Sequence, residues 1–324
     1  MELVAGIDLG GTETKFGLVN REGEMLAYQT IPTDPDIGYK TFFTYLANEI
    51  ECLLLSLGDD VALLGASVGA PTGSQANGTI DNPSNLNWPN SLPVSKILES
   101  LLEVPVTVVN DANAAAVGEM LFGAAQGYKN FFCVTLGTGL GCGVVIDGEL
   151  MLGSMGHAGE LGHVTAIKGG RMCGCGRMGC LETYASATGI VRTVLEAEKD
   201  EYEHSVLSTY HKTKITAKHI TDAAKEGDSL ALKAFDFTGK ILGEQLADTV
   251  AILNPELIVL TGGLTRAGDL LLNPTIKYMN CHLHDIYKGT VEIRLSEMNT
   301  KKTAILGSAA FMWLKLDSVS TQKV

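Results

Sequence analysis

The feature that most constrains the fold of this chain is one arrangement of strands that occurs twice. Apolar segments predict a meander of three strands at 3–10, 16–20 and 24–31, and a second meander at 131–139, 142–148 and 149–152. The first strand of each meander leads into a glycine-rich turn, DLGGT at 8–12 and LGTGLGCG at 136–143. We interpret the repetition as two related α/β halves that face a cleft.

Strands and helices alternate through the rest of the chain. Helices are predicted at 39–57, 95–103, 112–125, 183–199, 216–226, about 229–253, 268–280 and 303–315, and further strands at 63–71, 106–111, 257–263 and 291–296. The segment 71–93 is rich in Asn, Gly and Pro and is predicted to be a loop. Such alternation is typical of a mainly parallel or mixed sheet covered by helices. We expect the hinge between the halves near 112–125.

The length of the chain predicts two domains, and its net charge argues against some classes of function. A chain of 324 residues is too long for one ordinary core, so two domains are expected. The net charge of −13 argues against a general nucleic-acid or membrane-surface binder. A phosphate site remains open, because backbone amides can hold a phosphate without Lys or Arg. The longest apolar runs are far shorter than a membrane span and no secretory signal is visible, so a cytoplasmic location is expected.

The two glycine-rich turns are candidate phosphate loops. Glycine leaves room for a phosphate beside the backbone amides, and a threonine adds a hydroxyl donor. Asp8, at the end of the first strand, suits a Mg²⁺ ion held through water. A Gly-Gly pair between strands is also what an ordinary tight hairpin uses. Two such turns in matching halves favour a bound nucleotide, with residues Gly10, Gly11, Thr12, Gly137 and Thr138 at its phosphates, and Gly262 and Gly263 near its adenosine.

Asp111 is the candidate general base. It closes the strand-like segment VTVVND and precedes a helix, and ligands of open α/β sheets bind at the carboxyl ends of strands. A carboxylate there can accept a hydroxyl proton during phosphoryl transfer. The structural alternative is a helix N-cap, for which Asp111 or Asn113 would serve.

A segment rich in cysteine predicts a metal site. Between Glu160 and Glu182 the chain reads ELGHVTAIKGGRMCGCGRMGCLE, with its histidine and three cysteines at His163, Cys173, Cys175 and Cys180. Cys₃His is a common ligand set of structural zinc. A redox cluster or a disulfide is the alternative, but thiols stay reduced in the cytosol and close clusters there usually bind metal. His157 competes with His163 as the fourth ligand.

Taken together, these motifs resemble the ROK family of bacterial sugar kinases and repressors, and its glucokinases in particular. The resemblance covers essentially the whole chain and is carried by DLGGT (8–12), NDANAAAVGE (110–119), LGTGLGCGVV (136–145), GELGH (159–163), CGCGRMGCLE (173–182) and NPELIVLTGG (254–263). Each glycine turn is a loose signature, whereas GELGH combined with the cysteine motif is highly specific.

The resemblance implies an actin-like, hexokinase-type ATPase fold with two ribonuclease H-like halves that close over the substrates. It implies a smaller domain of residues 1–117 plus about 304–324, and a larger domain of 118–303 that holds the zinc loop 163–180. The reaction would transfer phosphate from MgATP to the 6-hydroxyl of a hexose, with glucose preferred, Asp111 as base and zinc as a structural ion. The implied sugar contacts are Asn85, Asn110, Asp111, Glu160, His163 and Glu182, and a homodimer is implied.

Three other readings stay open at this point. An N-acetylmannosamine or N-acetylglucosamine kinase would use the same frame, and polyphosphate could replace ATP. A sugar-sensing repressor would carry a DNA-binding region ahead of the first glycine turn, where only seven residues precede Asp8. A non-catalytic sugar-binding protein would not need both phosphate loops and Asp111.

Overall fold

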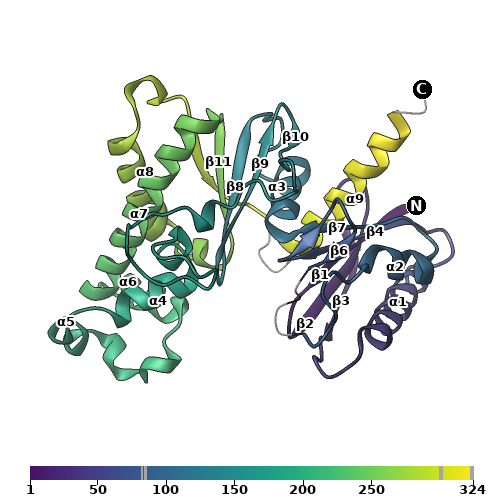
Figure 1. The fold of residues 1–324 in the computed structure, drawn as a ribbon, viewed down its shortest axis with the longest axis horizontal. Helices are drawn as coiled ribbons and strands as arrows, with labels where there is room; N and C mark the ends of the chain where they lie inside the picture. Colours follow the sequence, from purple (N-terminus) through teal and green to yellow (C-terminus); the bar gives the residue numbers. More distant parts are fainter. Residues whose placement is uncertain (82, 84–85, 299–301, 322–324) are drawn as a thin grey trace. The chain divides into compact units, whose positions relative to one another are not determined.

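The computed structural model describes residues 1–81, 83, 86–298 and 302–321, with side chains through 318. The chain divides into two compact units. The first consists of Met1–Gly127, Leu150–Ala158 and Glu297–Val324, and the second of Tyr128–Glu149 and Gly159–Ser296. Each unit is built on a five-stranded sheet (Figure 1).

The sheet of the first unit has the strand order β3-β2-β1-β4-β7. Its strands are β1 (Glu2–Leu9), β2 (Glu13–Val19), β3 (Met25–Pro32), β4 (Ala62–Ala70) and β7 (Val106–Asn110). The pairs β1–β2 and β2–β3 are antiparallel, which confirms the first meander. β4 and β7 run parallel to β1, so the carboxyl ends of these three strands lie at one edge of the sheet.

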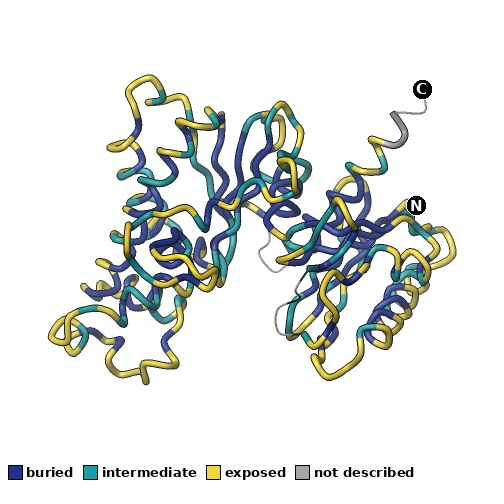
Figure 2. The backbone as a smooth tube through the Cα atoms, in the orientation of Figure 1, coloured by how far each residue is buried: buried dark blue, intermediate teal, exposed yellow. Residues whose placement is uncertain are grey.

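Helices cover both faces of this sheet. Successive residues of β1 point to opposite faces and therefore pack against different helices. Leu3, Ala5 and Ile7 belong to a core shared with α1 (Tyr39–Leu55) and α2 (Val94–Leu102). Val4 packs instead against α9 (Thr303–Thr321), which comes from the far end of the chain. β1, β4 and β7 are mostly buried, and buried segments are dark blue in Figure 2.

The helices α3 (Asp111–Phe122) and α9 cross at two glycines. A Cβ atom on Gly118 would lie 2.9 Å from the Cα of Gly307, and one on Gly307 would lie 2.5 Å from the carbonyl oxygen of Ala114. The backbones therefore touch along α3, which keeps the whole helix in the first unit. The first unit comprises 1–127, 150–158 and 297–324, whereas the resemblance implied a smaller domain of 1–117 plus about 304–324.

The sheet of the second unit repeats the first in topology. Its order is β10-β9-β8-β11-β12, with strands β8 (Phe131–Leu136), β9 (Leu140–Ile146), β10 (Glu149–Leu150), β11 (Leu257–Thr261) and β12 (Glu292–Leu295). β8 pairs with β9 antiparallel and with β11 parallel, and β11 pairs with β12 parallel. The repeated arrangement expected from the sequence is therefore present.

The helices of the second unit are α4 (Ala187–Leu195), α5 (Lys199–His204), α6 (Ala217–Lys225), α7 (Ser229–Leu253) and α8 (Asp269–His282). Short 3-10 turns are η1 (Leu161–His163), η2 (Leu181–Thr183), η3 (Val206–Thr209), η4 (Lys212–Lys214), η5 (Gly263–Ala267) and η6 (Asp285–Tyr287). α7 and α8 lie side by side (Figure 1). None of the described helices is long and apolar enough to cross a membrane.

Three details differ from the expectation. The helix expected at 183–199 begins at Ala187, because the Ser186 side chain caps it by accepting the amide hydrogen of Gly189. α5 was missed because none of its six residues is buried, so it carries no apolar periodicity. The loop expected at 71–93 contains a small hairpin of β5 (Gly73–Ser74) and β6 (Thr79–Ile80).

Candidate active site and metal centre

Two aspartates lie near the carboxyl edge of the first sheet. Asp8 is the penultimate residue of β1, and Asp111 directly follows β7. The strand between them, β4, pairs Gly69 with Asp8 and Ala70 with Asn110. Burial raises the pKa of the Asp8 carboxyl to about 6, and the Asp111 charge adds to this, while Lys15 lowers it. The two carboxylates are thus close enough to repel each other.

Asn110, rather than Asp111 or Asn113, is the N-cap of α3. Its side-chain oxygen accepts the amide hydrogens of Ala112 at 2.9 Å and of Asn113 at 3.3 Å. Its amide nitrogen donates to the carbonyl oxygen of Pro71 at 2.9 Å. Asp111 is therefore not the cap residue, although its Oδ1 also accepts the amide hydrogen of Ala112 at 2.8 Å. Asp111 is an exposed residue in the first turn, where the helix dipole favours a negative charge.

Replacing Asp8 with asparagine is expected to stabilise the protein in buffer without Mg²⁺. The folded-state pKa of about 6 lies above the ordinary value of 3.8, so stability from this group is present below pH 3.8 and is lost as the pH rises through 6. Asp8→Asn has no such loss, and at pH 8 it should gain roughly 2–3 kcal/mol in unfolding free energy. Urea unfolding at pH 8 and at pH 4.5 measures the difference. A gain that does not shrink at the lower pH would contradict the interpretation.

The first glycine turn joins β1 to β2. The amide of Gly10 donates to the carbonyl oxygen of Glu13, and a Cβ on Gly10 would lie 2.7 Å from that oxygen. Glycine is therefore required for the close approach of backbone to backbone. Gly11 and Thr12 complete the turn, and the Thr12 carbonyl accepts the amide hydrogen of Thr33.

The second glycine turn joins β8 to β9 and is bonded to the start of α4. Gly137 donates its amide hydrogen to the carbonyl oxygen of Gly139 at 3.0 Å. The carbonyl of Gly137 accepts from the amide of Ala187 at 2.8 Å, and that of Thr138 accepts from the hydroxyl of Thr188 at 2.7 Å. The turn is therefore held by two bonds that fix its backbone.

Gly262 and Gly263 follow β11, the strand beside β8. Gly262 has φ +99°, and a Cβ on it would lie 2.6 Å from the carbonyl oxygen of Leu136. Both the conformation and the space require glycine there. Gly263, in contrast, faces open space, so a ligand can reach its backbone. The structure thus brings Gly262 next to the second glycine turn.

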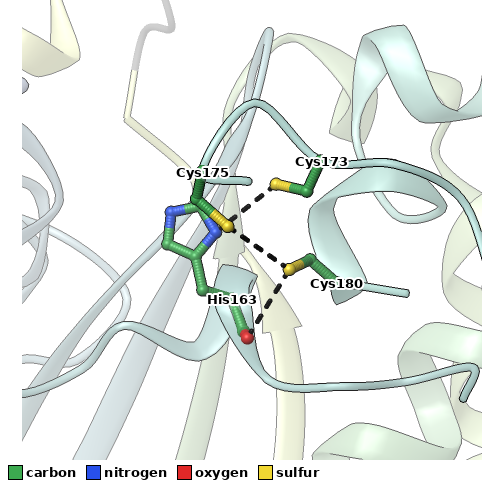
Figure 3. A group of neighbouring side chains, drawn as sticks. All are labelled: His163, Cys173, Cys175 and Cys180. Carbon is green, nitrogen blue, oxygen red and sulfur yellow. Dashed lines mark hydrogen bonds between the residues drawn. The ribbon is translucent and has the colours of Figure 1, made fainter. Parts of the chain in front are cut away.

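His163, Cys173, Cys175 and Cys180 come together as the sequence predicts (Figure 3). Their four ligand atoms lie within 4.8 Å of one another. The Cys175 and Cys180 sulfurs are 3.7 Å apart, and the Cys173 sulfur is 3.7 Å from Nδ1 of His163. A tetrahedral zinc site with bonds of about 2.3 Å to sulfur has edges of about 3.8 Å. The cluster therefore fits zinc, and His163 rather than His157 completes it.

An isolated β-bridge and a backbone hydrogen bond join the two ends of the metal loop, residues 163–180. Thr165 pairs with Cys180, and the amide of Leu181 donates to the carbonyl of Val164. Burial raises the pKa of the Cys173 thiol to about 12, whereas a backbone hydrogen bond from Arg177 lowers the pKa of Cys175. A metal ion is what would ionise the buried thiol.

Two glutamates flank His163 on opposite sides of its ring. Nε2 of His163 lies 3.9 Å from Oε2 of Glu160, while Nδ1 lies 3.8 Å from Oε1 of Glu182. Because Nδ1 faces the cysteines, a bound metal would leave Nε2 free to meet a ligand. The structure thus groups three of the expected sugar contacts within the second unit.

Glu182 also contacts the second glycine turn. Its Oε2 accepts the amide hydrogen of Leu140 at 3.3 Å, and a Cβ on Gly139 would lie 2.6 Å from the same oxygen. Glu182 and Gly139 line a hollow of about 430 Å³ that extends to Thr188 and Arg192 on α4. The carboxylate is therefore reachable by a ligand.

The remaining expected residues divide between the units. Asp8, Gly10, Gly11, Thr12, Asn110 and Asp111 belong to the first unit, and the residues from Gly137 onward to the second. Asn85 lies outside the described residues. The sequence reading missed Thr188 and Arg171, and the only signal for Thr188 was the cap sequence SATG at 186–189, which predicts a helix start.

The chain is similar to known proteins along nearly its whole length. The ROK family model matches residues 4–315. The glucokinase of Halalkalibacterium halodurans is 37% identical over 93% of this chain and 92% of its own length, and that of Thermotoga maritima is 36% identical over 95% and 96%. A ROK family glucokinase from Streptomyces griseus, solved in complex with glucose and AMPPNP, superposes with a TM-score of 0.78 at 30% identity, over 95% of this chain and 98% of that one.

These similarities extend along nearly the whole chain and include the fold. The expected actin-like, hexokinase-type fold is confirmed by solved ROK kinases. The chain belongs to the ROK family.

Proposed function

We propose that this protein is a glucokinase that transfers the terminal phosphoryl group of ATP to the 6-hydroxyl of glucose. The observation that carries the proposal is the similarity to glucokinases over more than nine-tenths of the chain at 36–37% identity. The solved relative that binds glucose and AMPPNP together supports both substrates.

Asp111 acts as the base in this proposal. A sugar hydroxyl has a pKa far above 7, so a carboxylate does not ionise it in the ground state. Asp111 instead accepts the proton as the bond to phosphorus forms. The Asn110 cap fixes the first turn of α3. It therefore holds the backbone of Asp111 in one position at the carboxyl end of β7, from which the carboxylate can accept the proton.

The glycine turns and Asp8 serve the nucleotide. The turns at Gly10, Gly11 and Thr12 and at Gly137 and Thr138 hold the phosphates. The amides of Gly10 and Gly137 are bonded within their own turns. Those of Gly11, Thr12 and Thr138 donate to phosphate oxygens as charge develops on them. Gly262 and Gly263 lie on the nucleotide side. Mg²⁺, when bound, neutralises phosphate charge, and the raised pKa of Asp8 beside Asp111 fits a carboxylate whose natural partner is a cation.

The sugar hydroxyls are bound by Glu160, His163 and Glu182, together with Asn110 and Asn85. Carboxylates accept hydrogen bonds from several hydroxyls at fixed angles, which suits a sugar. The arrangement of Glu160 and Glu182 on either side of His163 supports this role. Zinc in the Cys₃His cluster fixes the histidine ring and loop, and its function is structural.

The choice of sugar is the finer part of the proposal. Glucose is favoured over N-acetylmannosamine and N-acetylglucosamine because two relatives that are 36–37% identical over more than nine-tenths of the chain are glucokinases. An ADP-release assay with MgATP and a panel of hexoses and N-acetylhexosamines tests it, with polyphosphate as a second donor. We expect the highest kcat/KM with glucose. Preference for an N-acetyl sugar would contradict the glucose assignment but keep the kinase.

We further propose a homodimer in the cytoplasm that takes sugar and ATP as partners and binds neither nucleic acid nor membrane. The net charge of −13 supports the last two points. A repressor or a non-catalytic sugar-binding protein is less well supported, because Asp111 and both phosphate loops are present. No sugar-dependent ADP formation by correctly folded protein would favour those alternatives.

A further inference from the structure

The turn at residues 137–139 is held by the first residues of α4. The carbonyl of Gly137 accepts from the amide of Ala187 at 2.8 Å, and the carbonyl of Thr138 accepts from the hydroxyl of Thr188 at 2.7 Å. Two successive carbonyls therefore face the same helix. These two bonds fix the orientation of both peptides of the turn.

The direction of the carbonyls decides the direction of the amides. The peptide bonds of the described residues are all trans, and in a trans peptide the N–H points opposite to the C=O of the same unit. The carbonyl of Gly137 shares its peptide with the amide of Thr138, and the carbonyl of Thr138 shares its peptide with the amide of Gly139. Both amides consequently point away from α4. Successive N–H groups with a common direction form an anion-binding concavity.

We propose that Thr188 is a positioning residue for nucleotide binding, because its hydroxyl holds the peptide of Thr138 and Gly139 with the N–H toward the phosphates. The inference rests on the proposed kinase function. Thr188 does not touch the nucleotide in this account; it acts through the carbonyl of Thr138. Ala187 holds the neighbouring peptide through its backbone amide, so only the Thr188 bond can be removed by substitution.

The helix that carries Thr188 is itself held by the metal loop. Arg171 precedes the cysteines by two residues and donates to the carbonyl oxygens of Thr183 at 2.7 Å and Gly189 at 3.2 Å. It also donates to Thr193 Oγ1 at 3.0 Å and bonds to Glu196 at 2.7 Å. Only 8% of its side chain is exposed. Arg171 thus makes the start of α4 a rigid support.

Thr188→Val removes the hydroxyl with little change of shape, and with it both the bond to Thr138 and a 3.1 Å contact with Ser186 Oγ, the cap of α4. Thr188→Ser restores the hydroxyl. Titration calorimetry with Mg·AMPPNP should show binding about three- to tenfold weaker in the valine variant, the range that one hydrogen bond accounts for. Binding in the serine variant should stay near the wild-type value. Glucose affinity and zinc content should not change. Thr249→Val is the matched control, since its hydroxyl also donates to a carbonyl, that of Gln245, but within α7.

The outcomes separate this inference from the function on which it rests. Wild-type affinity for Mg·AMPPNP in Thr188→Val would overturn the positioning role and leave the kinase intact. Loss of glucose affinity or zinc along with nucleotide affinity would also overturn it, since the residue would then be merely structural. No binding of Mg·AMPPNP by the wild-type protein would contradict the proposed function itself.

Discussion

Asp111→Asn is expected to lower kcat for glucose phosphorylation by about 10²–10⁴-fold, the range that a positioned general base contributes. Asparagine keeps the shape of the side chain and leaves the Asn110 cap of α3 intact, but it cannot accept the hydroxyl proton. Glucose affinity should change little, because the other sugar contacts remain. Steady-state kinetics and calorimetric titration with glucose measure the two quantities.

The control for Asp111→Asn is Asp269→Asn. Asp269 is also an acidic residue in the first turn of a helix, α8, so its loss removes a similar interaction with the helix dipole. It should leave kcat unchanged. A kcat for Asp111→Asn within tenfold of wild type would remove Asp111 as the base, and an equal loss in both variants would point to a general effect of charge.

Cys180→Ser is expected to abolish stoichiometric zinc binding and to lower the free energy of unfolding of the second unit by roughly 3–5 kcal/mol, since metal binding contributes directly to folding. The thermal midpoint should fall by about 6–15 °C. Glucose affinity should also fall, because the ring of His163 and the carboxylate of Glu182 are both positioned at the cluster. Metal analysis, calorimetry and glucose titration measure the three effects.

Two other cysteines serve as controls for this substitution. Cys52 and Cys281 are exposed and lie outside the cluster of four, so their serine variants should keep zinc, stability and glucose affinity. A wild-type protein with no zinc would contradict the metal assignment. Unchanged thermal stability and glucose affinity in a zinc-free Cys180→Ser variant would contradict the structural role.

The repeated topology could be predicted because its signals are local. Each meander is a set of short apolar strands separated by turn residues, and each glycine turn follows the first strand directly. The Cys₃His group could be predicted because all four ligands come from one short segment whose glycines allow it to fold back. Gly179, with φ +84°, has such a conformation.

The hydrogen bonds that hold the second glycine turn could not be predicted, because they join segments that are distant in the sequence. Thr188 meets Thr138 across fifty residues of sequence, and a threonine after a capping serine reads as an ordinary helix start. The cap of α3 could not be identified for a similar reason: Asn110, Asp111 and Asn113 are all acceptable caps by type, and only the backbone geometry selects Asn110.

The most direct test of the central claim is to identify the product formed from glucose and MgATP. Phosphorus NMR of the reaction mixture, combined with a measurement of ADP, gives both the position and the stoichiometry of transfer. We expect glucose 6-phosphate and ADP in equal amounts. ADP without a sugar phosphate, a phosphate on another hydroxyl, or no reaction by folded zinc-loaded protein would contradict it.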